Sequence, residues 1–233
     1  YDLASLTKVV GTTSVIIALV QKGKLSLDDK VAIRLPGFAP TSLDKKILAR
    51  RNRVTIRHLL LHTSGLPGWK PLYRTCKSYR KLLNAILPTA LEAEPGSRYR
   101  YSDLGFILLG EIAARAGRKP IARLEKELGF APLGMKETRR NPSSTLKKRI
   151  PPTEFDEEKG SYIHGKVHDE NARAAGGITG HAGLFSTTSD LSLLARELLL
   201  ALKGKSRKFR QKTIESFVRC QDSPKGSSRA LGW

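Results

Sequence analysis

The strongest constraint in this sequence is an uncharged run near its start, covering residues 9–20. Most of these residues are aliphatic, and a helix that is apolar most of the way round lies in the interior of a protein. Lys8 directly precedes the run, and Gly23, a typical C-terminal cap, follows it. We therefore expect a buried helix that runs to about Lys22 and carries a lysine at its buried start.

Ser5 and Lys8 lie three residues apart at the start of this helix. At that spacing two side chains share one helical face, one turn apart. A serine hydroxyl becomes an effective nucleophile when a nearby base takes its proton, and a lysine serves as that base when its surroundings favour the neutral amine. The pair is therefore a candidate for nucleophilic catalysis. The alternative is a serine at a helix start beside a lysine that extends its amine to solvent.

The Ser-x-x-Lys pattern occurs three more times, and each copy lies among other charged residues: Ser42–Lys45, Ser78–Lys81 and Ser144–Lys147. We expect the lysines of these copies to be solvated. Only the first pair adjoins a buried helix, which favours catalysis there.

Composition limits the class of protein. The chain has 233 residues, of which 39% are hydrophobic, enough for a sizeable core. The 42 Lys and Arg against 21 Asp and Glu give a net charge of +21, which would attract a polyanion. However, the basic residues are scattered along the chain, and no nucleic-acid-binding motif is found. We interpret the charge as a basic, solvated surface and expect no nucleic-acid partner.

Neither a membrane span nor a metal site is expected. No apolar run reaches the length of a membrane span. Cys76 and Cys220 are far apart and lack metal-ligand spacing, so two free thiols are the expectation, with one disulfide as the alternative. His58 and His62 have a metal-ligand spacing, but a third ligand is missing. We expect His62 at a helix terminus and no metal or cofactor.

Helical patterns and capping residues place the other elements. The expected helices are 56–62 after Thr55, 81–87, 104–116 after a Ser102 or Asp103 cap, 120–128, 191–203 after a Thr187–Asp190 capping box, and 211–219. Residues 130–135 are expected to form a loop. Residues 139–171 are polar and predict a long loop with one short strand, of the kind that often frames a site. The glycine-dense segment 174–183 must pass close to another part of the chain.

Tyr101-Ser102-Asp103 is the only Tyr-x-Asp or Tyr-x-Asn sequence in the chain. A tyrosine beside a Ser-Lys pair can pass a proton to a leaving group. The alternative is a core tyrosine with its hydroxyl at the surface, followed by an aspartate cap. For Tyr101 alone the alternative is favoured, and only its combination with Ser5 and Lys8 points to chemistry.

The order of these motifs resembles the penicillin-recognising serine hydrolases. It is most similar to the class C β-lactamase-like branch, with its D-alanyl-D-alanine carboxypeptidases and esterases. The resemblance extends over nearly the whole chain, because stretches typical of that branch are spread along it: 25–31, 59–67, 95–96, 101–105, 132–135, 175–177 and 183–187.

The resemblance implies a fold and a set of roles. The fold would be the α/β (α+β) serine β-lactamase/DD-peptidase-like fold. Residues 1–233 would be a mostly helical fragment of one domain, comprising the helical lobe and part of the sheet lobe. Ser5 would be the acylated nucleophile, and its backbone N–H would supply half of the oxyanion hole. Lys8 and Tyr101 would share the general-base and general-acid work, and Asp103 would bind substrate.

The chain departs from the family pattern at its ends. The third box of the family, Lys-Thr-Gly or His-x-Gly on a strand, would follow Trp233, and strands that precede the nucleophile helix are also absent. His181-Ala182-Gly183 has the spelling of that box but is expected to run straight into a capped helix, so we do not assign it. We expect a chain cut at both ends, whose apolar helix faces lack partners and which is weakly stable or aggregation-prone alone.

A second departure is Asp103, which stands where the family has asparagine. A carboxylate accepts hydrogen bonds but donates none. It also favours the ammonium form of a nearby amine, which would weaken Lys8 as a base and put more of the role on Tyr101.

These observations predict a serine hydrolase that acts through an acyl-enzyme on amide or ester bonds. Its substrate would be a D-Ala-D-Ala-type peptide, a β-lactam or a simple ester, that is, a peptidoglycan-type or other small molecule. By resemblance, the protein would be located in the cell envelope, periplasmic or extracytoplasmic. The alternative is a catalytically impaired β-lactamase-like fold that serves as an envelope-binding or interaction protein.

Overall fold

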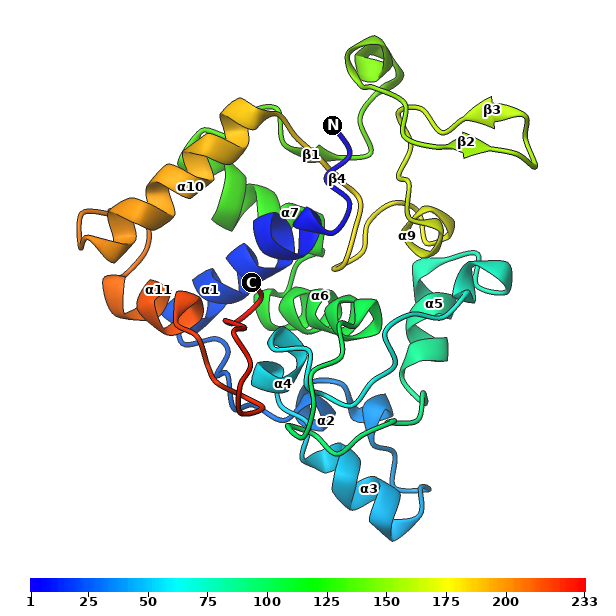
Figure 1. The fold of residues 1–233 in the computed structure, drawn as a ribbon, viewed down its shortest axis with the longest axis vertical. Helices are drawn as coiled ribbons and strands as arrows, with labels where there is room; N and C mark the ends of the chain where they lie inside the picture. Colours follow the sequence, from blue (N-terminus) through cyan, green and yellow to red (C-terminus); the bar gives the residue numbers. More distant parts are fainter.

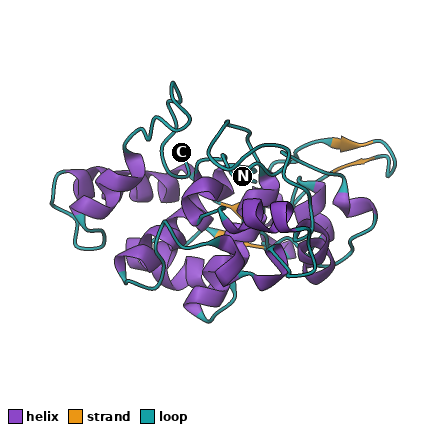
Figure 2. Ribbon diagram, turned by 90° about the horizontal axis from the view of Figure 1, so that it is seen from below, coloured by secondary structure: helices purple, strands orange, loops and turns teal.

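The computed structural model describes residues 1–233 and is dominated by helices (Figure 2). The α-helices are α1 (Ser14–Gln21), α2 (Val31–Arg34), α3 (Lys45–Asn52), α4 (Ile56–Leu60), α5 (Tyr79–Ile86), α6 (Asp103–Gly117), α7 (Ile121–Leu124), α8 (Ala131–Leu133), α9 (Glu170–Ala174), α10 (Thr188–Leu202) and α11 (Gln211–Val218). Two π-helical segments cover Lys8–Thr13 and Glu125–Phe130, and 3-10 turns cover Pro36–Phe38, Leu72–Arg74 and Ser144–Arg149.

The strands are short and form two antiparallel pairs. They are β1 (Arg139–Arg140) with β4 (Leu184–Phe185), and β2 (Phe155–Asp156) with β3 (Ser161–Tyr162). The first residues of the chain run along β4, because the Leu3 N–H donates to the Leu184 carbonyl at 2.9 Å and the Ser186 N–H donates to the Tyr1 carbonyl at 3.0 Å. This pairing fixes the position of the residues that immediately precede the opening helix.

The opening helix begins as the π-helical segment Lys8–Thr13 and continues as α1. It lies at the centre of the molecule beside α6 (Figure 1). Val15, Ile16 and Leu19 are at most 1% exposed, which confirms the predicted buried helix, and Gly23 ends it with a φ of +67°. The expectation that its apolar faces lack partners is wrong, because they pack against other segments of this chain.

One large core surrounds this helix. It contains 34 buried residues, drawn chiefly from α1, α4, α5, α6 and α11 and from the segments between them. Burying each aliphatic or aromatic side chain contributes about 1.5–3 kcal/mol relative to exposure. The core fixes the opening helix and α6 relative to each other, and the predicted site residues lie on these helices or just before them: Ser5, Lys8, Tyr101 and Asp103.

The glycine-dense segment 174–183 passes close to both helices, as predicted. A Cβ atom at Gly180 would lie 2.0 Å from the Phe106 carbonyl oxygen in α6, a distance that no side chain tolerates. On the other side, the Thr12 hydroxyl donates to the Gly180 carbonyl at 2.6 Å. Glycine is therefore required where this segment threads between the opening helix and α6.

Three predicted helix caps are confirmed. Thr55 and His58 form a reciprocal capping box at α4, so His58 has a structural role. The Ser102 hydroxyl accepts from the Gly105 N–H at 3.1 Å and caps α6. Thr187 caps α10 by accepting from the Asp190 N–H at 3.2 Å.

Both cysteines, Cys76 and Cys220, are free thiols, as expected.

Three local predictions are wrong. Residues 130–135 are not all loop, because helical structure continues from α7 through Glu125–Phe130 to α8, where Pro132 is tolerated in the first turn. The segment 139–171 contains β1, a 3-10 turn and the β2–β3 hairpin, since two-residue strands leave no periodic pattern to detect. His181-Ala182-Gly183 leads into β4 before the capped helix begins.

Candidate active site

A tight turn presents Ser5 to solvent at the start of the opening helix. Ala4 has a φ of +44°, in the left-handed region that alanine rarely adopts. Asp2 stabilises this turn, since its two carboxylate oxygens accept from the Ala4 N–H at 2.9 Å and from the His168 N–H at 2.8 Å. Ser5 is exposed, and its backbone N–H donates to no group of the protein. That free N–H can donate to a developing oxyanion.

Lys8 lies below Ser5 and is only 3% exposed. Its Nζ lies 3.0 Å from Ser5 Oγ, 3.2 Å from the His181 carbonyl oxygen and 2.7 Å from Asp103 Oδ1. The contacts with Ser5 and His181 have hydrogen-bond geometry, whereas the contact with Asp103 is an ion pair. A neutral amine that donates to the His181 carbonyl can turn its lone pair towards the Ser5 hydroxyl. This geometry therefore suits both the resting ion pair and a general base.

The other Ser-x-x-Lys pairs differ from this arrangement. In all three copies both the serine and the lysine are exposed. Ser78 is accounted for as the N-cap of α5. The prediction that these lysines are solvated is confirmed, and only Lys8 is buried.

Asp103 reaches Lys8 from the first turn of α6. Its backbone N–H donates to the Gly68 carbonyl at 2.8 Å, which fixes the start of the helix. The Lys8 amine is the only polar partner of Asp103 Oδ1. The carboxylate therefore supplies the acceptor half of what an asparagine amide would offer, and it adds a negative charge beside Lys8.

Tyr101 also lies beside Lys8, and the face of its ring makes the contact. Lys8 Nζ lies 4.8 Å from the centroid of the Tyr101 ring, within cation–π range. The ring is 38% exposed, and its hydroxyl makes no hydrogen bond within the protein. The structure thus brings Ser5, Lys8, Tyr101 and Asp103 together, with the phenol oxygen free to meet a ligand.

The ring of His62 packs against the ring of Tyr101. The sequence position of His62 did not reveal this contact. His62 lies just past the end of α4 with a φ of +58°, and its Nδ1 accepts from the Ser102 N–H at 2.9 Å. Its ring stacks on Tyr101 at 4.4 Å and on Phe106 at 5.0 Å between centroids. Burial, together with the positive charges of Lys8 and Arg229, lowers the pKa of His62 to about 3.

This shift predicts a pH-dependent stability. Since the pKa of His62 rises from about 3 in the folded protein to 6.5 in the unfolded chain, the unfolded state binds more protons between these values. The stabilisation is present above pH 6.5 and is lost as the pH falls towards 3. His62 alone should remove about 2 kcal/mol of unfolding free energy between pH 7 and pH 5. The variant His62→Gln keeps an acceptor for the Ser102 N–H but has no titrating group. Denaturant titrations should show that it loses less unfolding free energy between pH 7 and pH 5 than the wild type, and an equal loss in the two proteins would contradict this prediction.

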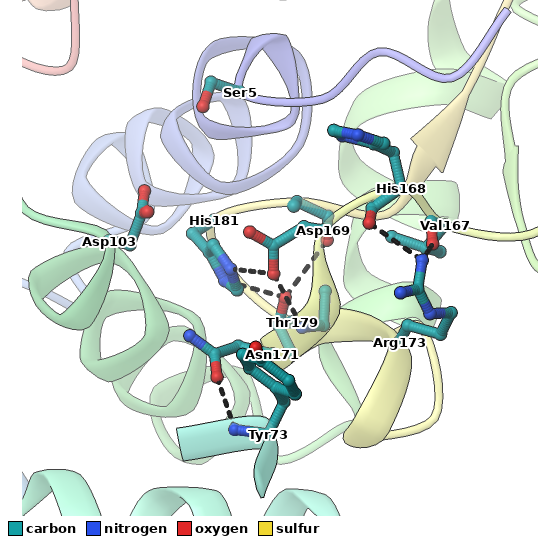
Figure 3. Close-up of polar contacts among 12 residues, drawn as sticks. Ser5, Tyr73, Asp103, Val167, His168, Asp169, Asn171, Arg173, Thr179 and His181 are labelled. Carbon is teal, nitrogen blue, oxygen red and sulfur yellow. Dashed lines mark hydrogen bonds and ion pairs between the residues drawn. The ribbon is translucent and has the colours of Figure 1, made fainter. Parts of the chain in front are cut away.

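A second polar group lies beside Lys8 and was not assigned from the sequence. His181 is 1% exposed, and its Nε2 lies 2.8 Å from Asp169 Oδ1. Figure 3 shows the two side chains facing each other, with Asp103 beyond the imidazole and Ser5 above. Burial raises the pKa of Asp169, but the hydrogen bond and charge of His181 outweigh it, so that the pKa lies below its usual range.

Asp103, Asp169 and His181 each place one potential ligand atom within 4.8 Å of the others. A cation there would have to displace Lys8 from Asp103 and the proton shared by His181 and Asp169. We therefore assign these side chains to the surroundings of Lys8.

No helix of the structure combines the length and apolar content needed to cross a bilayer.

Comparison with known proteins shows the family of the chain. Residues 1–233 match the Beta-lactamase family. The chain is 34% identical over 258 residues to a "Putative D-alanyl-D-alanine carboxypeptidase" of Salmonella typhimurium, and 33% identical over 256 residues to the protein of the same name in Escherichia coli. Both alignments cover the whole of this chain but only 58% of the relative's length.

Solved structures share the fold. A penicillin-binding protein from Bacillus halodurans superposes on the whole chain with a TM-score of 0.76 at 22% identity, and 69% of its own chain is covered. A β-lactamase/D-alanine carboxypeptidase from Pseudomonas syringae gives a TM-score of 0.76 at 21% identity, with 60% of its chain covered. The predicted β-lactamase/DD-peptidase-like fold is confirmed, and the chain belongs to the Beta-lactamase family.

Proposed function

We propose that this chain carries the catalytic centre of a serine hydrolase that forms an acyl-enzyme at Ser5. The observation that carries the proposal is the contact of 3.0 Å between Lys8 Nζ and an exposed Ser5 hydroxyl, with the remaining Lys8 contacts made to two acceptors. A buried amine held in this way directs its lone pair at the nucleophile, which is the geometry that general-base catalysis needs.

The reaction follows from these positions. Neutral Lys8 takes the Ser5 proton as Oγ attacks the substrate carbonyl carbon. The Ser5 N–H donates to the oxyanion that forms. As the bond to the leaving group breaks, a proton passes to that group from Lys8 or from the Tyr101 hydroxyl. Water then attacks the acyl carbonyl carbon and gives a proton to Lys8 or Tyr101, and that group protonates Ser5 Oγ as the acyl–Oγ bond breaks.

Amide or ester bonds of D-Ala-D-Ala-type peptides, β-lactams or simple esters are the substrates we propose. Support comes from the names of the relatives, which point to D-alanyl-D-alanine carboxypeptidases. A peptidoglycan-type substrate would place the enzyme in the cell envelope. The Lys8–Asp103 ion pair favours one competing function, a fold that binds the same ligands without acylation.

Covalent labelling tests the proposal. The full-length protein should be labelled by a fluorophosphonate or by a fluorescent penicillin, and an excess of unlabelled probe should prevent it. The labelled band should survive denaturation, since the bond is covalent. Reversible penicillin binding without a covalent adduct to either probe would reject the hydrolase and select the binding protein.

A further inference from the structure

A buried pair of side chains lies against Lys8 although both members are distant from it in sequence. His181 comes from the glycine-dense segment, and Asp169 is the N-cap of α9 (Figure 3). Asp169 Oδ1 accepts from His181 Nε2 at 2.8 Å and from the Ala172 N–H at 2.7 Å. Asp169 therefore ties the imidazole to the end of a helix.

Hydrogen bonds hold the imidazole through both ring nitrogens. Because an ionised carboxylate only accepts, His181 Nε2 must carry the proton of its bond to Asp169. On the other side, Thr179 Oγ1 lies 2.9 Å from His181 Nδ1 and 3.1 Å from the Ala182 carbonyl oxygen. The ring is therefore fixed by Asp169 on one edge and by Thr179 on the other.

The pair is coupled to the nucleophile through the backbone of His181. The His181 carbonyl accepts from Lys8 Nζ at 3.2 Å. Glycines flank this peptide at positions 180 and 183, and Gly183 has a φ of +107°. Glycine permits more backbone conformations than other residues, so the anchored ring adds a restraint on this carbonyl to those that Thr12 and Arg140 place on the neighbouring carbonyls. The His181 carbonyl is one of the two acceptors that turn the amine towards Ser5.

We propose that His181 and Asp169 form a positioning pair that holds Lys8 in its catalytic orientation. The inference rests on the proposed function. Besides this pair, three groups face Lys8 or lie near it: Asp103 is paired with it, His62 is neutral, and Tyr101 presents its ring.

Three variants of the full-length protein test this inference through the rate of covalent labelling. His181→Ala removes the anchor and should slow acylation about 100-fold while changing probe affinity by less than about twofold, because misplacing a base by about 1 Å costs this much. His181→Gln has an amide that can still donate to Asp169 and should recover most of the rate. Asp169→Asn keeps the α9 cap but removes the charge, and should slow acylation about 10-fold.

The chain offers a matched control. His168 Nε2 lies 2.8 Å from Glu154 Oε2 in an exposed pair of the same kind. Glu154→Gln removes the carboxylate charge of that pair, as Asp169→Asn does in the buried one, and should label at the wild-type rate. Thermal unfolding of each variant separates loss of fold from loss of rate, and Asp169→Asn provides the answer if His181→Ala does not fold.

The outcomes distinguish the two proposals. An unlabelled wild type would reject the hydrolase itself. A labelled wild type together with a folded His181→Ala or Asp169→Asn at the same rate would reject only the positioning pair. Equal slowing in His181→Gln and His181→Ala would also reject it, since a positioning role predicts recovery by the amide.

Discussion

Replacing Lys8 with methionine is expected to slow acylation of Ser5 by about 10³-fold, because general-base catalysis contributes about 10²–10⁴-fold. Methionine fills a similar space but cannot take the Ser5 proton. It also leaves Asp103 Oδ1 without its only polar partner, which should lower the unfolding free energy by about 1–3 kcal/mol. Labelling time courses measure the first effect, and denaturant titrations measure the second.

The control for this variant is Lys147→Met in the exposed Ser144–Lys147 pair. It has the same spacing and the same change but no buried amine, so labelling and stability should match the wild type. If Lys8→Met labels as fast as the control at equal pH, Lys8 is not the base, and Tyr101 becomes the remaining candidate among the assembled residues.

Replacing Ser5 with alanine should have the largest effect, reducing turnover by on the order of 10⁴-fold or more and abolishing covalent labelling. No other hydroxyl in the structure combines exposure with a contact to Lys8 Nζ. The fold should be almost unaffected, because Ser5 is exposed and its hydroxyl makes a single contact. Active-site titration and initial rates on an activated ester measure the loss, with a thermal unfolding curve as the test of folding.

Ser144→Ala is the matched control, since it removes an exposed serine from the same sequence pattern. Its titration should match that of the wild type. Stoichiometric labelling that persists in Ser5→Ala would show that another residue is the nucleophile and would remove the basis of the proposed mechanism.

The opening helix and the residues on it could be predicted from sequence because their signals are local. Twelve uncharged residues require burial, and the spacing of Ser5 and Lys8 sets a shared face before any tertiary contact is known. The caps at Thr55, Ser102 and Thr187 are also local, since each acts within one turn of its helix. Such local features can be recognised in the sequence before any tertiary contact is known.

The contact between Lys8 and His181 could not be predicted, because it joins distant residues, whereas the family resemblance implied Tyr101 and Asp103 beside Lys8. His181 and Lys8 are 173 positions apart, and a single histidine in a glycine-dense segment gives no sign of its partner. The only hint was the density of glycine itself, which indicated a close approach without naming the helices involved. His62 was placed correctly near a helix terminus, but its stacking against Tyr101 and Phe106 depends on tertiary packing.

The most direct test of the account is to locate the adduct by peptide mass spectrometry after labelling with a fluorophosphonate. Trypsin cleaves after Lys8, so the account predicts that the added mass lies on the peptide ending there, with fragment ions assigning it to Ser5. An adduct on any other serine, tyrosine or lysine, or unmodified peptide after saturating treatment, would contradict a nucleophile at the start of the buried helix.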